Sequence, residues 1–375
     1  MNRFPPNDII HLVGEAPRYD LAESLGPNLQ LSDLLDEPAW HELATLSLGY
    51  GTAEGDAALR AQIAQAHGVG PDDVVVTAGG MQALFLLAFT LCGPGTEAVA
   101  ATPLFPLARH ALEAVGTEVR PLALTFDAGY QPDLSQLQGL LSPRTRLVSL
   151  ASPQNPSGVA IPLATLRQIA ALMAEHAPQA WLLVDETYRD APYGNAPPAT
   201  SALELGPRVV STASLSKCHG APGLRIGWAI TRDADLRAQL VTAKFNTTIA
   251  CDNLEEALAL RLLRQGGPLL AGRRTHMARN LALTEAWVQR EAEFVEWVRP
   301  DAGALCCVRL KPAVFGEAAV GRFHAALPAQ GVRVGDGRWF GESARVFRLG
   351  FGLLQERELG EALQGVSAAL RQALG

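Results

Sequence analysis

The sequence predicts an α/β protein with a mostly parallel central sheet, because short apolar runs alternate with helical patterns and because polar residues follow directly after those runs. Leu163, Leu166, Ile169 and Met173 fit one face of a helix with a period of 3.6 residues. Strands that alternate with such helices form a parallel sheet covered on both faces. The strands of this sheet are expected at residues 73–77, 98–102, 147–150, 181–184 and 209–212.

The chain of 375 residues is too long for one ordinary core. From about Leu254 a helical stretch begins, and we expect it to break at the Gly266-Gly267-Pro268 segment. Two apolar strand candidates follow, Cys306–Leu310 and Val346–Leu349. We therefore expect a large domain over residues 40–265 and a smaller α/β domain over residues 1–39 and 266–375.

Composition and charge exclude several classes of function. The formal net charge is -7 and no basic stripe is present, so we expect no nucleic-acid partner. The longest apolar run, Ala83–Cys92, is far shorter than the roughly 20 residues that a membrane span needs. The first residues have no apolar signal region, and the five cysteines have no zinc-binding spacing. We expect a cytoplasmic protein with reduced thiols and no metal.

Polar residues gather where the predicted strands end. Gly79, Asn155, Asp185 and Lys217 each lie just beyond the end of such a strand. In an open parallel sheet the ligand binds beyond the carboxyl ends of the strands. These four positions therefore predict one shared site.

The segment around Lys217 carries a family resemblance. Ser214-Leu-Ser-Lys217 is followed by Pro-Gly-Leu-Arg225-Ile-Gly, so an arginine stands eight residues after the lysine. Asn155-Pro-Ser-Gly158 and Asp185-Glu-Thr-Tyr188 precede it. Together these motifs resemble the class I and II aminotransferases, which are fold-type I enzymes that depend on pyridoxal phosphate. The resemblance extends from Gly14 to Arg348 with its landmarks in family order.

The chemistry of pyridoxal phosphate explains two of these residues. A lysine amine is needed to hold the aldehyde reversibly as a Schiff base, and the released amine can then move the α-proton. The resemblance assigns this role to Lys217. A carboxylate at a strand end keeps the ring nitrogen protonated, and the resemblance assigns this role to Asp185. An Asp after a strand is also a common helix N-cap, so a purely structural role is the alternative.

The resemblance implies roles for the remaining cofactor contacts. Tyr188 and Asn155 would bind the phenolic oxygen of the ring, and Phe105 would stack on the ring unless it is a core residue. The phosphate needs backbone N–H groups and positive charge. Its expected ligands are Gly79, Gly80, Met81, Ser214, Arg225 and, from the partner subunit of a homodimer, Tyr50. A helix is expected to begin near Gln82.

The substrate's α-carboxylate calls for a planar, two-pronged donor. By the resemblance this donor is Arg348, although Arg345 is close enough for a register error. Gly14 matches the N-terminal glycine that approaches the same carboxylate, and a simple turn glycine is the alternative. Asn155 would also contact the substrate.

The resemblance implies an aminotransferase that moves the α-amino group of an amino acid to a 2-oxo acid. Lyases, decarboxylases, racemases and cyclases share the same fold and the same residues, so a lyase, decarboxylase or cyclase is the alternative. A DNA-binding regulator of related fold is disfavoured by the acidic charge. Side-chain specificity is left open: Lys244 and Asn246 match the family only loosely. An acidic entrance near Glu15 would favour a basic substrate.

Overall fold

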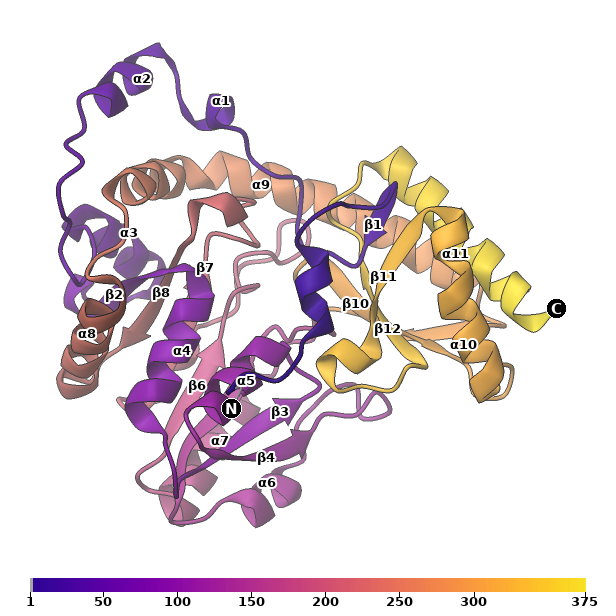
Figure 1. Cartoon of the computed structure of the whole chain (residues 1–375), viewed down its shortest axis with the longest axis horizontal. Helices are drawn as coiled ribbons and strands as arrows, with labels where there is room; N and C mark the ends of the chain where they lie inside the picture. Colours follow the sequence, from indigo (N-terminus) through magenta and orange to yellow (C-terminus); the bar gives the residue numbers. More distant parts are fainter. Residues whose placement is uncertain (1–2) are drawn as a thin grey trace.

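The computed structural model describes residues 3–375, and it contains two sheets linked by one long helix (Figure 1). The larger sheet has seven strands in the order β2-β8-β7-β6-β5-β3-β4. All of its strands run parallel except β8, which is antiparallel to both of its neighbours. Its strands are β2 (Val74–Ala78), β3 (Glu97–Thr102), β4 (Glu118–Ala123), β5 (Thr145–Ala151), β6 (Trp181–Asp185), β7 (Val209–Ser214) and β8 (Ile226–Thr231). The predicted α/β class with a mostly parallel sheet is confirmed.

Both faces of this sheet are buried, and alternate residues of each strand face opposite layers of helices. In β3, Val99 and Ala101 pack against one set of helices while Ala98 and Ala100 pack against the other. The first layer contains α6 (Leu134–Leu140) and α7 (Leu163–His176), and the second contains α4 (Gly79–Leu91), α5 (Pro106–Ala114) and α8 (Ala234–Thr248). Residues of α3 (Ala57–His67) cover the end of the sheet at β2 and β8. Because helices cover both faces of the sheet, the sequences of its strands are continuous apolar runs.

The smaller sheet has five strands in the order β1-β11-β12-β10-β9. The pair β1 and β11 is parallel, and the other pairs are antiparallel. Its strands are β1 (Tyr19–Leu21), β9 (Val295–Val298), β10 (Leu305–Leu310), β11 (Val332–Asp336) and β12 (Val346–Gly350), and α10 (Glu317–Ala326) and α11 (Glu356–Leu374) share its core. β1 therefore brings the N-terminal segment into a sheet that is otherwise built from the last eighty residues.

The expected helix break at Gly266-Gly267-Pro268 is wrong. Helix α9 (Asn253–Arg290) continues through Pro268 and runs across the molecule from the large sheet to the small one (Figure 1). Its first half packs Leu258 and Leu262 into the large-domain core, and its second half packs Trp287 into the small-domain core. Tertiary packing of the two halves outweighs the low helix propensity of this segment.

The expected boundary between the two domains, at residues 265 and 266, therefore falls inside the continuous helix α9. The short helices α1 (Leu31–Leu34) and α2 (Glu37–Ala44) add Leu34, Leu35 and Ala39 to the core that contains the first half of α9. We keep a large domain of about residues 40–265 and a small domain of residues 1–39 and 266–375 as a proposal, with residues 31–39 packed against the large domain.

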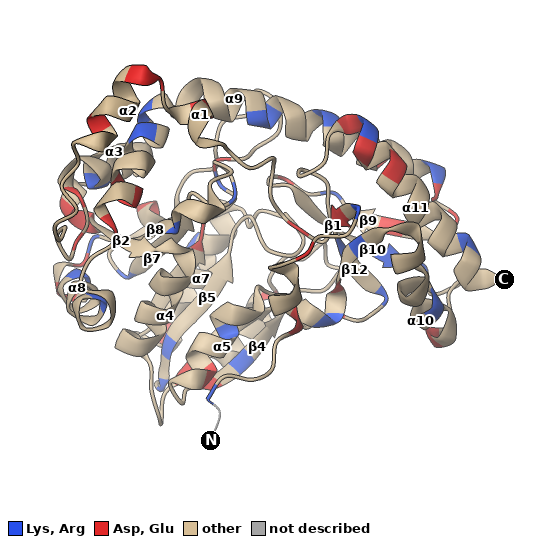
Figure 2. Ribbon diagram, turned by 45° about the horizontal axis from the view of Figure 1, so that its top comes forward, with Lys and Arg blue, Asp and Glu red and all other residues tan. Residues whose placement is uncertain are grey.

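The surface carries both signs of charge. Acidic and basic residues are interspersed along α9 and α11 (Figure 2). Within residues 3–375, none of the helices is both long enough and apolar enough to cross a membrane. The five cysteines are free thiols.

Candidate active site

The candidate site lies at the edge of the large sheet where β2, β5, β6 and β7 end and where β8 begins. Gly79 follows β2, Asn155 follows β5, Asp185 is the last residue of β6, and Lys217 follows β7. Arg225 directly precedes β8, whose antiparallel direction brings this residue back to the same edge. Residues from the ends of five strands thus converge, as expected for an open α/β sheet.

Lys217 stands out among the lysines of this chain. The sequence has only three, Lys217, Lys244 and Lys311. The Lys311 amine donates to the carbonyl of Ala292. The Lys244 amine is fully buried and has no hydrogen-bond partner within the described residues, but it lies near Cys251 and Glu256 and not at the strand ends. Within residues 3–375, the Lys217 amine has no hydrogen-bond or ion-pair partner. Burial lowers its pKa to about 8, the effect of Glu23 opposes this, and Arg348 and Arg225 reinforce it. A lysine with this pKa supplies a substantial fraction of neutral, nucleophilic amine near pH 8.

Asp185 has one oxygen fixed and one oxygen left over. Its Oδ1 accepts hydrogen bonds from the Thr187 backbone N–H at 3.0 Å and from the Thr187 hydroxyl at 2.6 Å. Its Oδ2 has no hydrogen-bond partner within residues 3–375. Burial raises the pKa of this carboxyl, while the bonds from Thr187 and the charge of Lys217 act against it. The carboxylate is therefore oriented by the protein and keeps one oxygen to accept from a ligand.

Arg348, on β12 of the small sheet, is a buried cation without an acidic partner. It is 2% exposed, and its Nη1 donates to Asn155 Oδ1 at 2.8 Å. Its Nη2 donates to the carbonyl of Ala22, its guanidinium lies 4.4 Å from the centre of the Phe340 ring, and its Nε has no partner within residues 3–375. Burial lowers its pKa. A buried guanidinium that is neutralised by no carboxylate is a binding site for an anionic group.

The alternative arginine is already paired elsewhere. Arg345 donates to the carbonyl of Phe315 and to Glu317. The register that places Arg348 toward Asn155 and Lys217 is therefore the one that the fold realises.

The start of α4 forms a cradle for an anion. No side chain caps this helix, so N–H groups of its first turn remain available. The helix begins at Gly79, three residues before the expected start near Gln82, and Gly79 itself has a left-handed φ of 70°, which turns the chain sharply from β2 into the helix. A Cβ at Gly79 would lie 2.3 Å from Arg225 Nη2, so the guanidinium covers this turn. Arg225 itself has a φ of 47°, a strained conformation for a residue other than glycine and one that is common at functional sites.

Ser214 and Gly227 complete the cradle. A Cβ at Gly80 would lie 3.6 Å from the Ser214 Cβ, which places the serine side chain beside the first turn of α4. A Cβ at Gly227 would lie only 2.4 Å from the Gly80 nitrogen. Glycine in β8 therefore allows the helix terminus to approach the sheet. Met81 is half-buried in the same first turn.

Tyr188 is buried, and its hydroxyl donates to Ser24 Oγ at 2.8 Å. Burial raises the pKa of this phenol well above its ordinary value. Asn155 uses its carbonyl oxygen for Arg348, so its amide N–H groups are free to donate to a ligand. Phe105 is half-buried at the start of α5, and the preceding Leu104 N–H donates to the Phe340 carbonyl at 3.1 Å. Tyr188, Asn155 and the residue before Phe105 are thus each hydrogen-bonded to a residue of the small domain.

Two expected residues are not joined to this cluster. Gly14 lies on an exposed turn before β1, and a Cβ added there would meet no atom within 4 Å. The N-terminal backbone that contacts the Arg348 side chain belongs to Ala22. Tyr50 is 87% exposed. It has no hydrogen-bond partner within the described residues 3–375.

Sequence reasoning missed several residues of the site. Thr187 orients Asp185, Ser24 binds Tyr188, and Phe340 stacks on Arg348. A threonine two residues after an Asp is a recognisable side-chain turn motif and could have been found. Ser24 and Phe340 carry no local signal, because both reach the site only through contacts between the two domains.

The residues present fit pyridoxal phosphate. An amine without a partner, a carboxylate with one free oxygen, free amide donors and an uncapped helix terminus with a serine and an arginine are all found at one edge of the sheet. Within residues 3–375 no group of His, Cys, Asp and Glu is arranged to hold a metal ion.

Comparisons with known proteins agree with this chemistry. Residues 30–366 match the family model for aminotransferase class I and II. The chain is 34% identical to capreomycidine synthase from Streptomyces vinaceus, covering 88% of this chain and 82% of the relative. It is 29% identical to arginine–pyruvate transaminase from Pseudomonas aeruginosa, covering 87% and 83%.

Solved structures show the same fold. A PLP-dependent aminotransferase from Streptococcus suis superimposes with a TM-score of 0.90 at 24% identity, covering 99% of this chain and 98% of that one. A PLP-dependent cyclase superimposes with a TM-score of 0.86 at 25% identity, covering 99% and 98%. The predicted fold-type I architecture, the cofactor and the aminotransferase activity are thereby supported, and the chain belongs to the class I and II aminotransferase family of pyridoxal-phosphate-dependent enzymes.

Proposed function

We propose that this aminotransferase binds its cofactor through Lys217 and its amino-acid substrate through Arg348. The observation that carries the proposal is the meeting of an unpaired, depressed-pKa lysine with a buried arginine that has no acidic partner. When bound, pyridoxal phosphate supplies an aldehyde that takes up amino groups and a ring that accepts electrons from the substrate's Cα. The remaining steps are carried by side chains of this protein.

The guanidinium of Arg348 binds the substrate's α-carboxylate. Asn155 and the Ala22 carbonyl hold the guanidinium in plane, and Phe340 supports one face. This fixed orientation places the substrate's Cα between Arg348 and Lys217. The amine of Lys217, neutral in a substantial fraction near pH 8, can remove the proton from the substrate's Cα and hold it until it is returned.

The other residues bind the cofactor. The free oxygen of Asp185 would accept a hydrogen bond from the protonated ring nitrogen, and the amide of Asn155 and the hydroxyl of Tyr188 would contact the phenolic oxygen. The first turn of α4 (Gly79, Gly80 and Met81), Ser214 and Arg225 hold the phosphate. Phe105 stacks on the ring. Gly14, on the exposed turn before β1, would approach the substrate's carboxylate from the N-terminal segment.

We further propose a homodimer in which Tyr50 of one subunit binds the phosphate in the other. Tyr50 is 87% exposed and the nearby Leu48 is 82% exposed, so both side chains are available to a second subunit. Size-exclusion chromatography with light scattering tests the dimer. A fully active monomer would remove this role of Tyr50. The five free thiols also fit a cytoplasmic location.

The test of the function is a donor panel. Purified protein loaded with pyridoxal phosphate is incubated with single amino acids, with and without a 2-oxo acid acceptor, and both products are quantified by mass spectrometry. We expect a new amino acid to form from the acceptor in equal amount to the 2-oxo acid formed from the donor. Turnover that needs no acceptor and gives a cyclised or eliminated product would favour the alternative, which capreomycidine synthase and the cyclase structure keep open.

A further inference from the structure

The N-terminal segment 21–25 is fixed against the candidate site from both sides of Glu23. The Ala22 carbonyl accepts from Arg348, and Ser24 Oγ accepts from Tyr188 at 2.8 Å. Below the segment, a Cβ at Gly350 would lie 1.7 Å from the Glu23 carbonyl oxygen, so the backbone rests directly on β12. Residue 23 is therefore held between two contacts to residues of the site.

The Glu23 carboxylate is half-buried and unpaired, which it shares with Glu54 and Glu255, but it alone of the three lies between residues that contact Arg348 and Tyr188. Within residues 3–375 it has neither a hydrogen bond nor an ion pair. Its neighbour Asp20 is paired with Arg333 at 2.6 Å. Two fully buried acids are paired as well: Glu186 accepts from Ser201, Ser211 and Ala202, and Glu291 is paired with Arg371. A carboxylate left free next to a binding site is available to a ligand.

The charges around this carboxylate belong to the groups that hold the substrate. Glu23 raises the pKa of Lys217 more than Asp185 does, and it also acts on Arg348. The two arginines that act on Lys217 are Arg348 and Arg225. In the proposed function the first binds the α-carboxylate and the second binds the phosphate. Both arginines are therefore already assigned, and neither is left to bind a carboxylate on the substrate's side chain. The Glu23 carboxylate, in contrast, has no assigned partner.

We propose that Glu23 recognises the cationic end of a basic amino-acid donor, a guanidinium or an alkylammonium group. The inference rests on the proposed function, because it takes Arg348 as the α-carboxylate site. With the α-carboxylate on Arg348 and the α-amino group at Lys217, the donor's side chain remains to be bound, and Glu23 is the charged group beside both anchors that neither of them uses. A neutral donor would leave this half-buried carboxylate without a partner.

The test compares donors that differ only in charge. Values of kcat/KM are measured on the holoenzyme for arginine against citrulline and for lysine against norleucine. We expect the wild-type protein to prefer the charged member of each pair by about ten- to a hundredfold, as a hydrogen-bonded charge pair implies. In Glu23→Gln the preference should fall close to one, and Glu23→Asp should keep part of it. The exposed Glu293→Gln removes the same charge and should leave the preference unchanged.

Two outcomes would overturn the inference. An equal loss for all four donors in Glu23→Gln would mean that Glu23 acts on Lys217 and not on the substrate side chain. An unchanged preference would mean that Glu23 does not contact the donor at all.

A binding measurement separates this inference from the proposed reaction. α-Methylornithine and α-methylnorvaline lack the α-proton and cannot be turned over, so calorimetry reports their binding alone. If α-methylornithine binds more tightly and the difference requires Glu23, the inference stands even where no amino transfer occurs. If amino transfer occurs but both compounds bind equally, the function stands and the inference fails.

Discussion

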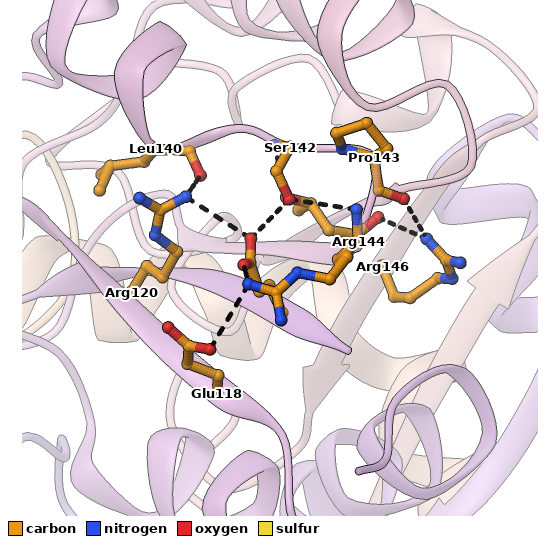
Figure 3. A network of polar contacts seen from close by, with 9 residues as sticks. Glu118, Arg120, Leu140, Ser142, Pro143, Arg144 and Arg146 are labelled. Carbon is orange, nitrogen blue, oxygen red and sulfur yellow. Dashed lines mark hydrogen bonds and ion pairs between the residues drawn. The ribbon is translucent and has the colours of Figure 1, made fainter. Parts of the chain in front are cut away.

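The two opposite edges of the large sheet both contain buried polar side chains, but they differ in how these side chains are paired. At the amino end of β3, the Glu97 carboxylate is 2% exposed and bonds to Arg144, Arg120 and Ser142, whose mutual arrangement is seen in Figure 3. At the carboxyl end, Lys217 has no polar partner within residues 3–375 and Arg348 has no acidic one. Pairing is complete on one edge and left incomplete on the other.

This difference separates stability from binding. A buried carboxylate that accepts hydrogen bonds from several donors contributes to folding, because those bonds compensate for its removal from water. A buried amine or guanidinium without a counter-ion costs free energy in the empty protein, and it regains that free energy only when a ligand supplies the missing charge. The comparison therefore predicts that substitutions at the carboxyl edge change catalysis and that those at the amino edge change stability.

The largest effect is expected for Lys217→Ala. Loss of both the covalent attachment and the proton-transferring amine should reduce kcat for amino transfer about a thousandfold or more. Borohydride reduction of the holoenzyme followed by peptide mass spectrometry should find the cofactor on Lys217 in the wild-type protein and on no lysine in the variant. Lys311→Ala is the control, because its amine contacts only a backbone carbonyl. Wild-type turnover by Lys217→Ala would refute the assigned role.

The next effect is expected for Arg348→Lys. An ammonium lacks the planar fork of a guanidinium, so it cannot keep the bonds to Asn155 and the Ala22 carbonyl and also present two parallel N–H groups to a carboxylate. The value of kcat/KM for every donor should therefore fall about a hundredfold. Cofactor occupancy, measured by visible absorbance, should change little. Arg345→Lys, whose side chain pairs with Glu317, should leave kcat/KM unchanged. An equal loss in both variants would show that the effect is structural.

The pH dependence of cofactor attachment tests the electrostatics of the carboxyl edge. Because burial lowers the pKa of Lys217 to about 8, the neutral amine becomes the major form above that pH. The rate at which the apoprotein attaches pyridoxal phosphate should rise about tenfold per pH unit below this value and level off above it. Stopped-flow absorbance measures the rate. A rise that continues beyond pH 10 would mean that Lys217 has the pKa of an exposed lysine.

The smallest effect on activity is expected for Glu97→Gln at the amino edge. Removing the charge that Arg144 and Arg120 share should lower the free energy of unfolding by about 1–3 kcal/mol. The value of kcat per folded molecule should not change. Urea unfolding and steady-state kinetics measure the two quantities. Glu118→Gln, an exposed partner of Arg144 at 3.8 Å, should cost at most about 0.5 kcal/mol. A loss of kcat in Glu97→Gln would break the division between the two edges.

Much of the fold could be predicted because it depends on local patterns. The strands that end at Ala78, Ala151, Asp185 and Ser214 were predicted from short apolar runs. Strand β8 was missed because its apolar run follows directly after the lysine segment, and its antiparallel direction is set by pairing with β2 and β7. The break expected at Pro268 was wrong because two separate cores hold the two halves of α9.

The site shows the same division. Gly79, Asn155, Asp185 and Lys217 were placed at strand ends, and strand ends meet at one edge of a sheet without further information. The neighbour of Arg348 could not be placed in this way. The carbonyl that accepts from the Arg348 side chain belongs to Ala22, which is 326 residues away from Arg348 in the sequence. Such a pairing depends on how the N-terminal segment packs on β12.

The sequence by itself determined the class of the fold, the edge that holds the chemistry and the lysine that performs it, because periodicity and short motifs report on local structure. The tertiary structure alone decided which polar groups are paired and which are free. Arg345 and Arg348 are three residues apart in the sequence. Only packing pairs Arg345 with Glu317 and leaves Arg348 buried near Lys217 without an acidic partner in the described residues. Glu23 became a candidate for substrate recognition for the same reason, since its lack of a partner is a property of the folded protein and not of its sequence.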